Sequence, residues 1–64
     1  MKDIYRIWYV DVSDQITRMF RFDSISDALE TFDSLRADLG CSCATLEVST
    51  GSGDFAIDSF HRDL

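Results

Sequence analysis

The 64-residue sequence has few basic residues, no long apolar run, no proline, one histidine and two cysteines. Six lysines and arginines stand against twelve aspartates and glutamates, so the formal net charge is −6 at pH 7. Nucleic acid and anionic lipid repel a chain of this charge, and direct binding to either is disfavoured. No apolar stretch approaches about 18 residues, and no basic start leads into one. The sequence therefore predicts neither a membrane span nor a signal peptide.

The thiols and the histidine are too few for a metal centre. A structural zinc needs four ligands, and Cys41, Cys43 and His61 supply three. A disulfide between strand residues two apart would be strained, so the cysteines are expected to be buried or half-buried thiols in a reducing cytoplasm. No sequence motif around His61 marks a catalytic triad, a nucleophile elbow or an oxyanion turn, and the domain is small for a water-excluding pocket. The sequence predicts no enzyme, no metal and no cofactor.

What the sequence does contain is enough apolar surface for one core. It is 45% hydrophobic and has one tryptophan, two tyrosines and five phenylalanines. Burial on this scale offsets the ordering entropy of a short chain, but a chain this short cannot support two cores. We expect a single domain over residues 1–64.

Residues 4–12 and 16–22 are rich in aromatic and β-branched side chains without helical spacing, and they predict an antiparallel hairpin. A two-residue loop would place Arg6 opposite Arg21, which is a destabilising like-charge pair. A four-residue loop over residues 13–16 is preferred, since it pairs opposite charges and sets an arginine against an indole. That register predicts the pairs Asp11–Arg18, Tyr9–Phe20, Trp8–Arg21, Ile7–Phe22 and Arg6–Asp23.

An amphipathic helix is predicted after Ser24, a good N-cap residue that is followed three positions later by Asp27. Gly40 is expected to provide a left-handed C-cap. One apolar stripe runs along this helix at the spacing of helical turns, with Arg36 on its flank. The stripe consists of Ile25, Ala28, Leu29, Phe32, Leu35 and Leu39.

Residues 43–49 and 54–60 alternate and predict a second hairpin, in which Gly51-Ser52 forms a type II′ loop. That register places three pairs on one face of the sheet: Val48–Phe55, Leu46–Ile57 and Ala44–Ser59. The fold is predicted to be α+β with the order β-β-α-β-β. One helix is predicted to cover one face of a four-stranded, mainly antiparallel sheet. The sequence does not determine the order of the strands.

The charge is unevenly divided along the chain. Residues 1–22 hold four basic and three acidic residues, net +1, whereas residues 23–64 hold two basic and nine acidic residues, net −7. One face of the predicted helix is acidic and lacks the lysines that normally balance such a face. A line of carboxylates this dense matches part of a phosphate backbone, because a duplex strand presents one phosphate per about 3.4 Å. The predicted acidic face consists of Asp23, Asp27, Glu30 and Asp38 with Ser34 among them, and Asp33 lies to one side of it.

The uncovered face of the sheet is the second candidate surface. It is predicted to carry a further acidic set, Glu47, Asp54 and Asp58, and a contiguous apolar patch. An apolar patch of this kind on a small domain indicates an interface with a partner or a second copy. The patch is predicted to contain Trp8, Val10, Met19 and Phe60.

The whole pattern resembles the small acidic inhibitors that bacteriophages encode, in particular anti-CRISPR proteins that mimic DNA. The resemblance rests on the short length, the single α/β layer pair, a pI near 4.3 and the unbalanced carboxylates. It covers the full chain in character and has no signature motif. It implies a cytoplasmic protein in a bacterial host that occludes the basic, DNA-holding surface of a CRISPR effector.

Two other hypotheses remain open from the sequence. An immunity protein or antitoxin that covers a basic nuclease site would use the same physics. A homodimeric regulatory protein would instead pair through the face of Trp8 and Phe60. The protein is expected to be a monomer or a homodimer.

Overall fold

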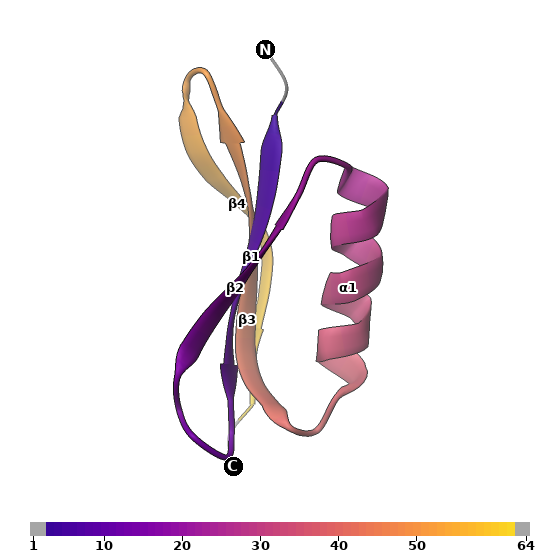
Figure 1. Cartoon of the computed structure of the whole chain (residues 1–64), viewed down its shortest axis with the longest axis vertical. Helices are drawn as coiled ribbons and strands as arrows, with labels where there is room; N and C mark the ends of the chain where they lie inside the picture. Colours follow the sequence, from indigo (N-terminus) through magenta and orange to yellow (C-terminus); the bar gives the residue numbers. More distant parts are fainter. Residues whose placement is uncertain (1–2, 63–64) are drawn as a thin grey trace.

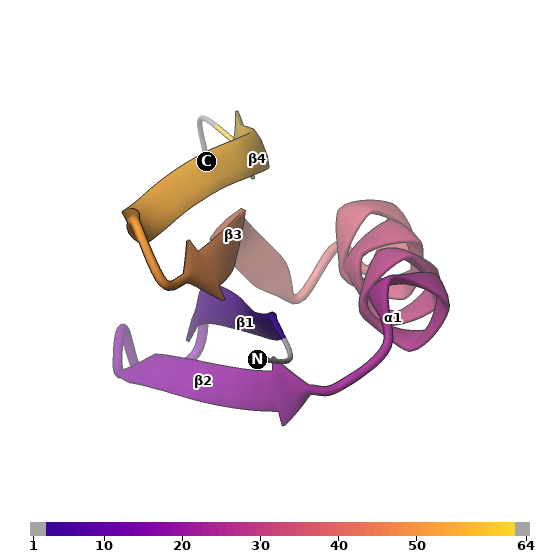
Figure 2. The ribbon, with the colours of Figure 1, turned by 90° about the horizontal axis from the view of Figure 1, so that it is seen from above.

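The computed structural model describes residues 3–62 and confirms the predicted α+β fold (Figure 1). One antiparallel sheet has the strand order β2-β1-β3-β4, and one helix lies on one side of it (Figure 2). The helix connects β2 to β3, which run in the same direction on either side of β1. The elements are β1 (Ile4–Asp11), β2 (Thr17–Phe22), α1 (Ile25–Ala37), β3 (Cys41–Thr50) and β4 (Gly53–His61).

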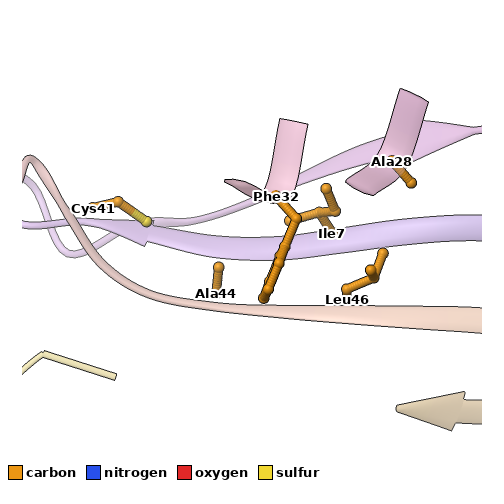
Figure 3. Close-up of a cluster of buried hydrophobic side chains, with 6 residues drawn as sticks. All are labelled: Ile7, Ala28, Phe32, Cys41, Ala44 and Leu46. Atoms are coloured by element: carbon orange, nitrogen blue, oxygen red, sulfur yellow. The ribbon is translucent and has the colours of Figure 1, made fainter. Parts of the chain in front are cut away.

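The core lies between α1 and the two central strands. Phe32 and Ala28 of the helix point toward Ile7 of β1 and Leu46 of β3 (Figure 3). These side chains are at most 1% exposed, and Cys41 and Ala44 complete the cluster. Burying a phenylalanine, an isoleucine and a leucine contributes about 1.5–3 kcal/mol each, which is a large share of the stability of so small a domain. The helix is therefore held by its central turns.

The ends of α1 differ from the prediction. Ser24 occupies the N-cap position, but its side chain makes no capping hydrogen bond. The helix ends at Ala37, with Asp38 in an extended conformation, so the left-handed C-cap predicted at Gly40 is wrong. The carboxylate of Asp38 accepts a hydrogen bond from the Gly40 N–H at 2.8 Å, and this turn replaces the glycine cap. Leu39 consequently lies outside the helix and is 81% exposed.

The register of the first hairpin is not the one preferred from the sequence. Arg6 lies opposite Arg21, and Trp8 lies opposite Met19 rather than Arg21. The like-charge pair is tolerated because β1 has a second neighbour, β3, from which Glu47 pairs with Arg6 at 3.2 Å. The predicted pairs Asp11–Arg18, Tyr9–Phe20, Ile7–Phe22 and Arg6–Asp23 are therefore wrong.

The loop of this hairpin holds its own charges. Asp11 accepts hydrogen bonds from the backbone and hydroxyl of Ser13, and Asp14 pairs with Arg18. Gln15 adopts a φ of 59°. The carboxylate of Asp14 also accepts a hydrogen bond from the Ile16 N–H. The sequence associates this register with a two-residue loop. These local bonds instead hold a longer connection in place.

The second hairpin follows its predicted register only near the turn. Val48 pairs with Phe55 as predicted, but a bulge between Leu46 and Glu47 shifts the remainder of β4 by one residue. Leu46 therefore pairs with Asp58, and Ala44 pairs with Phe60, so the predicted pairs Leu46–Ile57 and Ala44–Ser59 are wrong. A one-residue slip moves every later side chain to the other face of the sheet.

The two-residue loop itself is confirmed, because Thr50 pairs with Gly53 across Gly51-Ser52. The type II′ assignment is wrong, because the positive φ belongs to Gly53, at 129°, and not to Gly51. The hydroxyl of Thr50 accepts a hydrogen bond from the Ser52 N–H and donates one to the Gly53 carbonyl.

Candidate partner-binding surface

The acidic face of α1 is exposed, as the sequence predicts. We call the five predicted residues the acidic ridge: Asp27, Glu30 and Asp33 lie within α1, whereas Asp23 precedes the N-cap Ser24 and Asp38 follows the last helical residue. At 1.5 Å per residue the ridge follows roughly 20 Å of helix axis. All five residues are exposed to solvent, because Ala28 and Phe32 turn the opposite side of the helix toward the sheet.

Four of the ridge carboxylates are unpaired within the part of the chain that the structure describes. Among residues 3–62, no ion pair or hydrogen bond engages the carboxylates of Asp23, Asp27, Glu30 or Asp33. Asp38 differs, because its carboxylate bonds the Gly40 N–H and its carbonyl accepts a hydrogen bond from Arg62 at 3.2 Å. The ridge is thus a row of carboxylates with a structural residue at its C-terminal end.

The carboxylates of the sheet are paired with arginines. Glu47 accepts a hydrogen bond from Arg6 at 3.2 Å and one from the Trp8 indole N–H at 2.8 Å. Asp54 lies 3.7 Å from the same guanidinium. Arg6 lies between the carboxylates of Glu47 and Asp54, and the three side chains form a network on the face of the sheet opposite α1. Glu47 and Asp54 therefore serve the fold, and because they share one arginine, the network keeps a single net negative charge.

Asp58 lies on the side of the helix, contrary to the prediction for the uncovered face. The bulge turns it toward α1, where the Arg36 guanidinium donates a hydrogen bond to its carboxylate at 2.6 Å. This bond lowers the pKa of Asp58 below its ordinary value. Arg36 also lies over the ring of Phe32, 5.1 Å from the centroid, which confirms its place on the flank of the apolar stripe.

The predicted apolar patch divides between the two faces. Trp8 and Met19 lie together on the uncovered face and are 41% and 42% exposed. Phe60 lies on the opposite face, because the bulge turns it toward Phe32, with ring centroids 5.6 Å apart. The prediction for Phe60 is therefore wrong. Val10, the residue of the patch next to Trp8 on the same face, pairs with Cys43.

A further exposed apolar strip was missed by the sequence reasoning. On the side of α1 that faces β4, Ile25 and Leu29 are 43% and 42% exposed. In β4, Phe55 and Ile57 are 53% and 44% exposed. The width of the helical stripe was the signal in the sequence. Arg36 follows Leu29 by seven residues, so both lie on the same flank of the stripe.

The two cysteines are free thiols, in agreement with the sequence-based prediction. Cys41 is buried and its thiol donates to the Cys43 carbonyl at 3.4 Å, whereas Cys43 is partly exposed. Burial raises the pKa of the Cys41 thiol, which keeps it protonated. Within residues 3–62, no group of three or more histidine, cysteine, aspartate or glutamate side chains comes together as a metal site.

The described part of the chain also contains no helix with the length and apolar character that crossing a bilayer requires. The fold defines a two-layer α+β domain with an acidic helix. Comparisons with family models, curated proteins and solved structures return no significant match.

Proposed function

We propose that the protein inhibits a basic nucleic-acid-binding protein by presenting the acidic ridge in the place of DNA. The observation that carries this proposal is the contrast in pairing between the two acidic regions. The sheet carboxylates Glu47, Asp54 and Asp58 each contact an arginine, while four ridge carboxylates have no partner among residues 3–62. Charge that the fold does not use internally is available to a partner.

The spacing of the ridge supports mimicry of a phosphate backbone. Five acidic residues line roughly 20 Å of helix axis, a length over which one strand of duplex DNA presents about six phosphates. Three of the carboxylates sit on a helix, and the other two flank it; the opposite side of this helix is anchored by Phe32 and Ala28, which are at most 1% exposed. A fixed row of charges binds with less loss of conformational entropy than a flexible acidic tail does.

The binding mode follows from the charges. A basic groove that holds nucleic acid through lysines and arginines would attract the ridge over a distance, so association is fast and weakens with added salt. Once bound, the domain blocks the groove by its volume and by occupying the basic side chains. The protein acts by binding, and no catalytic step is required.

A CRISPR effector is the favoured partner. Such a complex holds its guide and target strands in a positively charged channel that contacts the backbone and not the sequence. A surface that reproduces only backbone charge suits that channel. The proposal thus describes an anti-CRISPR-like inhibitor that works in the cytoplasm of a bacterial host.

The test is displacement of labelled duplex DNA from a guide-loaded CRISPR effector complex, followed by fluorescence anisotropy. We expect the native protein to release the DNA, and to release less at high salt. The matching variant reverses Asp27, Glu30 and Asp33 to lysine; Asp38 is left unchanged because its carboxylate holds the turn at Gly40. This variant should remain folded by circular dichroism and should release no DNA.

Two results would contradict the proposal in different ways. If the folded triple variant still displaces DNA, the acidic ridge is not the binding surface. If the native protein displaces DNA from no effector across a panel of complexes, the favoured partner is wrong. A purified basic nuclease belongs in the same panel, since its inhibition would reassign the partner and leave the role of the ridge intact.

A further inference from the structure

The face of the sheet opposite α1 carries no element of the described chain (Figure 2). We call it the open face. Ile7 is fully buried toward the helix, so strand alternation turns its neighbours Arg6 and Trp8 to the open face. Their partners in the register lie on the same face. The residues that matter here are Arg6, Trp8, Met19, Arg21, Glu47 and Asp54.

The charges on the open face are balanced and divided by strand. Arg6 and Arg21 belong to the adjacent strands β1 and β2, whereas Glu47 and Asp54 belong to β3 and β4. One half of the face therefore carries Arg21, which has no ion-pair partner within residues 3–62, and the other half carries two carboxylates that share Arg6. The acidic ridge lies on the other side of the sheet, so the open face is where two chains of net charge −6 can meet without like-charge repulsion.

The apolar part of the open face lies on β1 and on the edge strand β2. Trp8 and Met19 are direct neighbours across β1 and β2, and each is about two-fifths exposed. The indole of Trp8 is held by its hydrogen bond to Glu47. Tryptophan, methionine and arginine are enriched at protein interfaces, and a side chain already held in place loses little freedom on binding.

We infer that the open face binds a second copy of this chain, in a symmetric dimer whose two-fold axis runs parallel to the strands. That axis places β2 of one copy over β4 of the other, and β1 over β3. Arg21 then meets the half of the partner that carries Glu47 and Asp54, the two carboxylates that share Arg6. The two sheets pack face to face, as in a β-sandwich.

The alternative two-fold axis, perpendicular to the strands, is disfavoured by charge. It would place β2 over β2 and β1 over β1, and so set the arginine half of each copy against the arginine half of the other. Like charges that face each other across an interface disfavour association. Only the axis parallel to the strands makes the open face complementary to itself.

The size of the face predicts a weak dimer. Four strands about 4.8 Å apart, each with about seven residues at about 3.3 Å, give a face of roughly 450 Å² per copy. Two such faces approach the roughly 1,000 Å² that separates specific interfaces from incidental contacts. We therefore expect a dimer that dissociates reversibly on dilution. Its two helices point outward, and this assembly does not depend on what the acidic ridge binds.

The test is sedimentation equilibrium of the native chain from about 1 μM to 1 mM, with two single variants, Arg21→Glu and Asp54→Lys. Each variant places like charges together twice across the axis, so we expect the dissociation constant of the dimer to rise at least about tenfold. An equimolar mixture should form heterodimers, because the introduced glutamate of one variant then meets the introduced lysine of the other.

A matched pair of controls separates the open face from other exposed apolar positions. Met19→Glu places a carboxylate on the open face, and Leu39→Glu places one after the end of α1, where Leu39 is 81% exposed. We expect the first to abolish the dimer and the second to leave it unchanged, with both folded by circular dichroism. A native chain that stays monomeric at 1 mM overturns the inference, as does a dimer that is unaffected by Met19→Glu, Arg21→Glu and Asp54→Lys.

Discussion

The acidic ridge and the acidic residues of the sheet have similar side chains but differ in whether those side chains are paired within the fold. Glu47 is held by Arg6 and the indole of Trp8, and Asp58 is held by Arg36. Asp23, Asp27, Glu30 and Asp33 have no such partner in residues 3–62. The difference teaches that net charge alone does not locate a binding surface. Carboxylates that are paired within the fold stabilise it, and those left unpaired are the ones that a partner can use.

The largest effect is expected from removing the anchor that holds the ridge in place. Phe32→Ala removes the largest fully buried side chain and should cost about 3–5 kcal/mol. A domain of this size has a total stability of only about 5 kcal/mol, so the variant should be largely unfolded at 37 °C. Thermal unfolding by circular dichroism measures this. A cooperative transition near that of the native protein would show that the helix is not held as described.

The next effect separates the two acidic regions by stability. Glu47→Ala leaves the Arg6 guanidinium and the Trp8 N–H without their acceptor, and we expect a loss of about 1–2 kcal/mol. The matched change Glu30→Ala removes a carboxylate without a partner from an exposed helical position, so stability should change by less than about 0.5 kcal/mol. Urea unfolding of both variants provides the comparison. Equal losses would remove the distinction between the two regions.

Acid should lower the free energy of unfolding, because it protonates carboxylates whose pKa is lowered in the folded state. Hydrogen bonds from Arg36 lower the pKa of Asp58, those from Arg18 lower that of Asp14, and those from Ser13 lower that of Asp11. A group whose pKa is lower in the folded state stabilises that state at pH values above its unfolded pKa, which is near 3.8 for these aspartates. This contribution is lost as the pH falls through the folded pKa. The free energy of unfolding should therefore fall below about pH 4.

The variant Asp58→Asn tests the source of this acid sensitivity. Its free energy of unfolding should be lower than that of the native protein at about pH 6 and should fall less steeply between about pH 4 and pH 2. Urea unfolding at each pH gives both values. The same slope in both proteins would show that the Arg36–Asp58 pair does not contribute to the pH dependence.

The fold could be predicted from the sequence because its strongest signals are local. The stripe that contains Ala28 and Phe32 predicted the helix, the aromatic and β-branched composition predicted the first hairpin, and alternation predicted the second. The acidic ridge followed from the same helical period. These features depend on the positions of residues along one element, and neighbouring strands do not change them.

Register could not be predicted because it depends on strands that are distant in the sequence. The pair Arg6–Arg21 looked destabilising until Glu47 of β3 was placed beside Arg6. The bulge in the second hairpin left no signal in the alternating pattern, yet it moved Asp58 and Phe60 to the helix side of the sheet. The site assignments that failed are those that lie beyond that bulge.

The central claim is that unpaired ridge carboxylates, and not net charge, carry the binding. The most direct measurement is DNA displacement from the effector by two variants whose net charge changes equally. One variant neutralises the ridge with Glu30→Gln and Asp33→Asn. The other adds two positive charges at exposed positions away from it, with Ile16→Lys and Ser52→Lys. We predict that the first loses most of its inhibition and that the second keeps it; equal losses in both would contradict the claim.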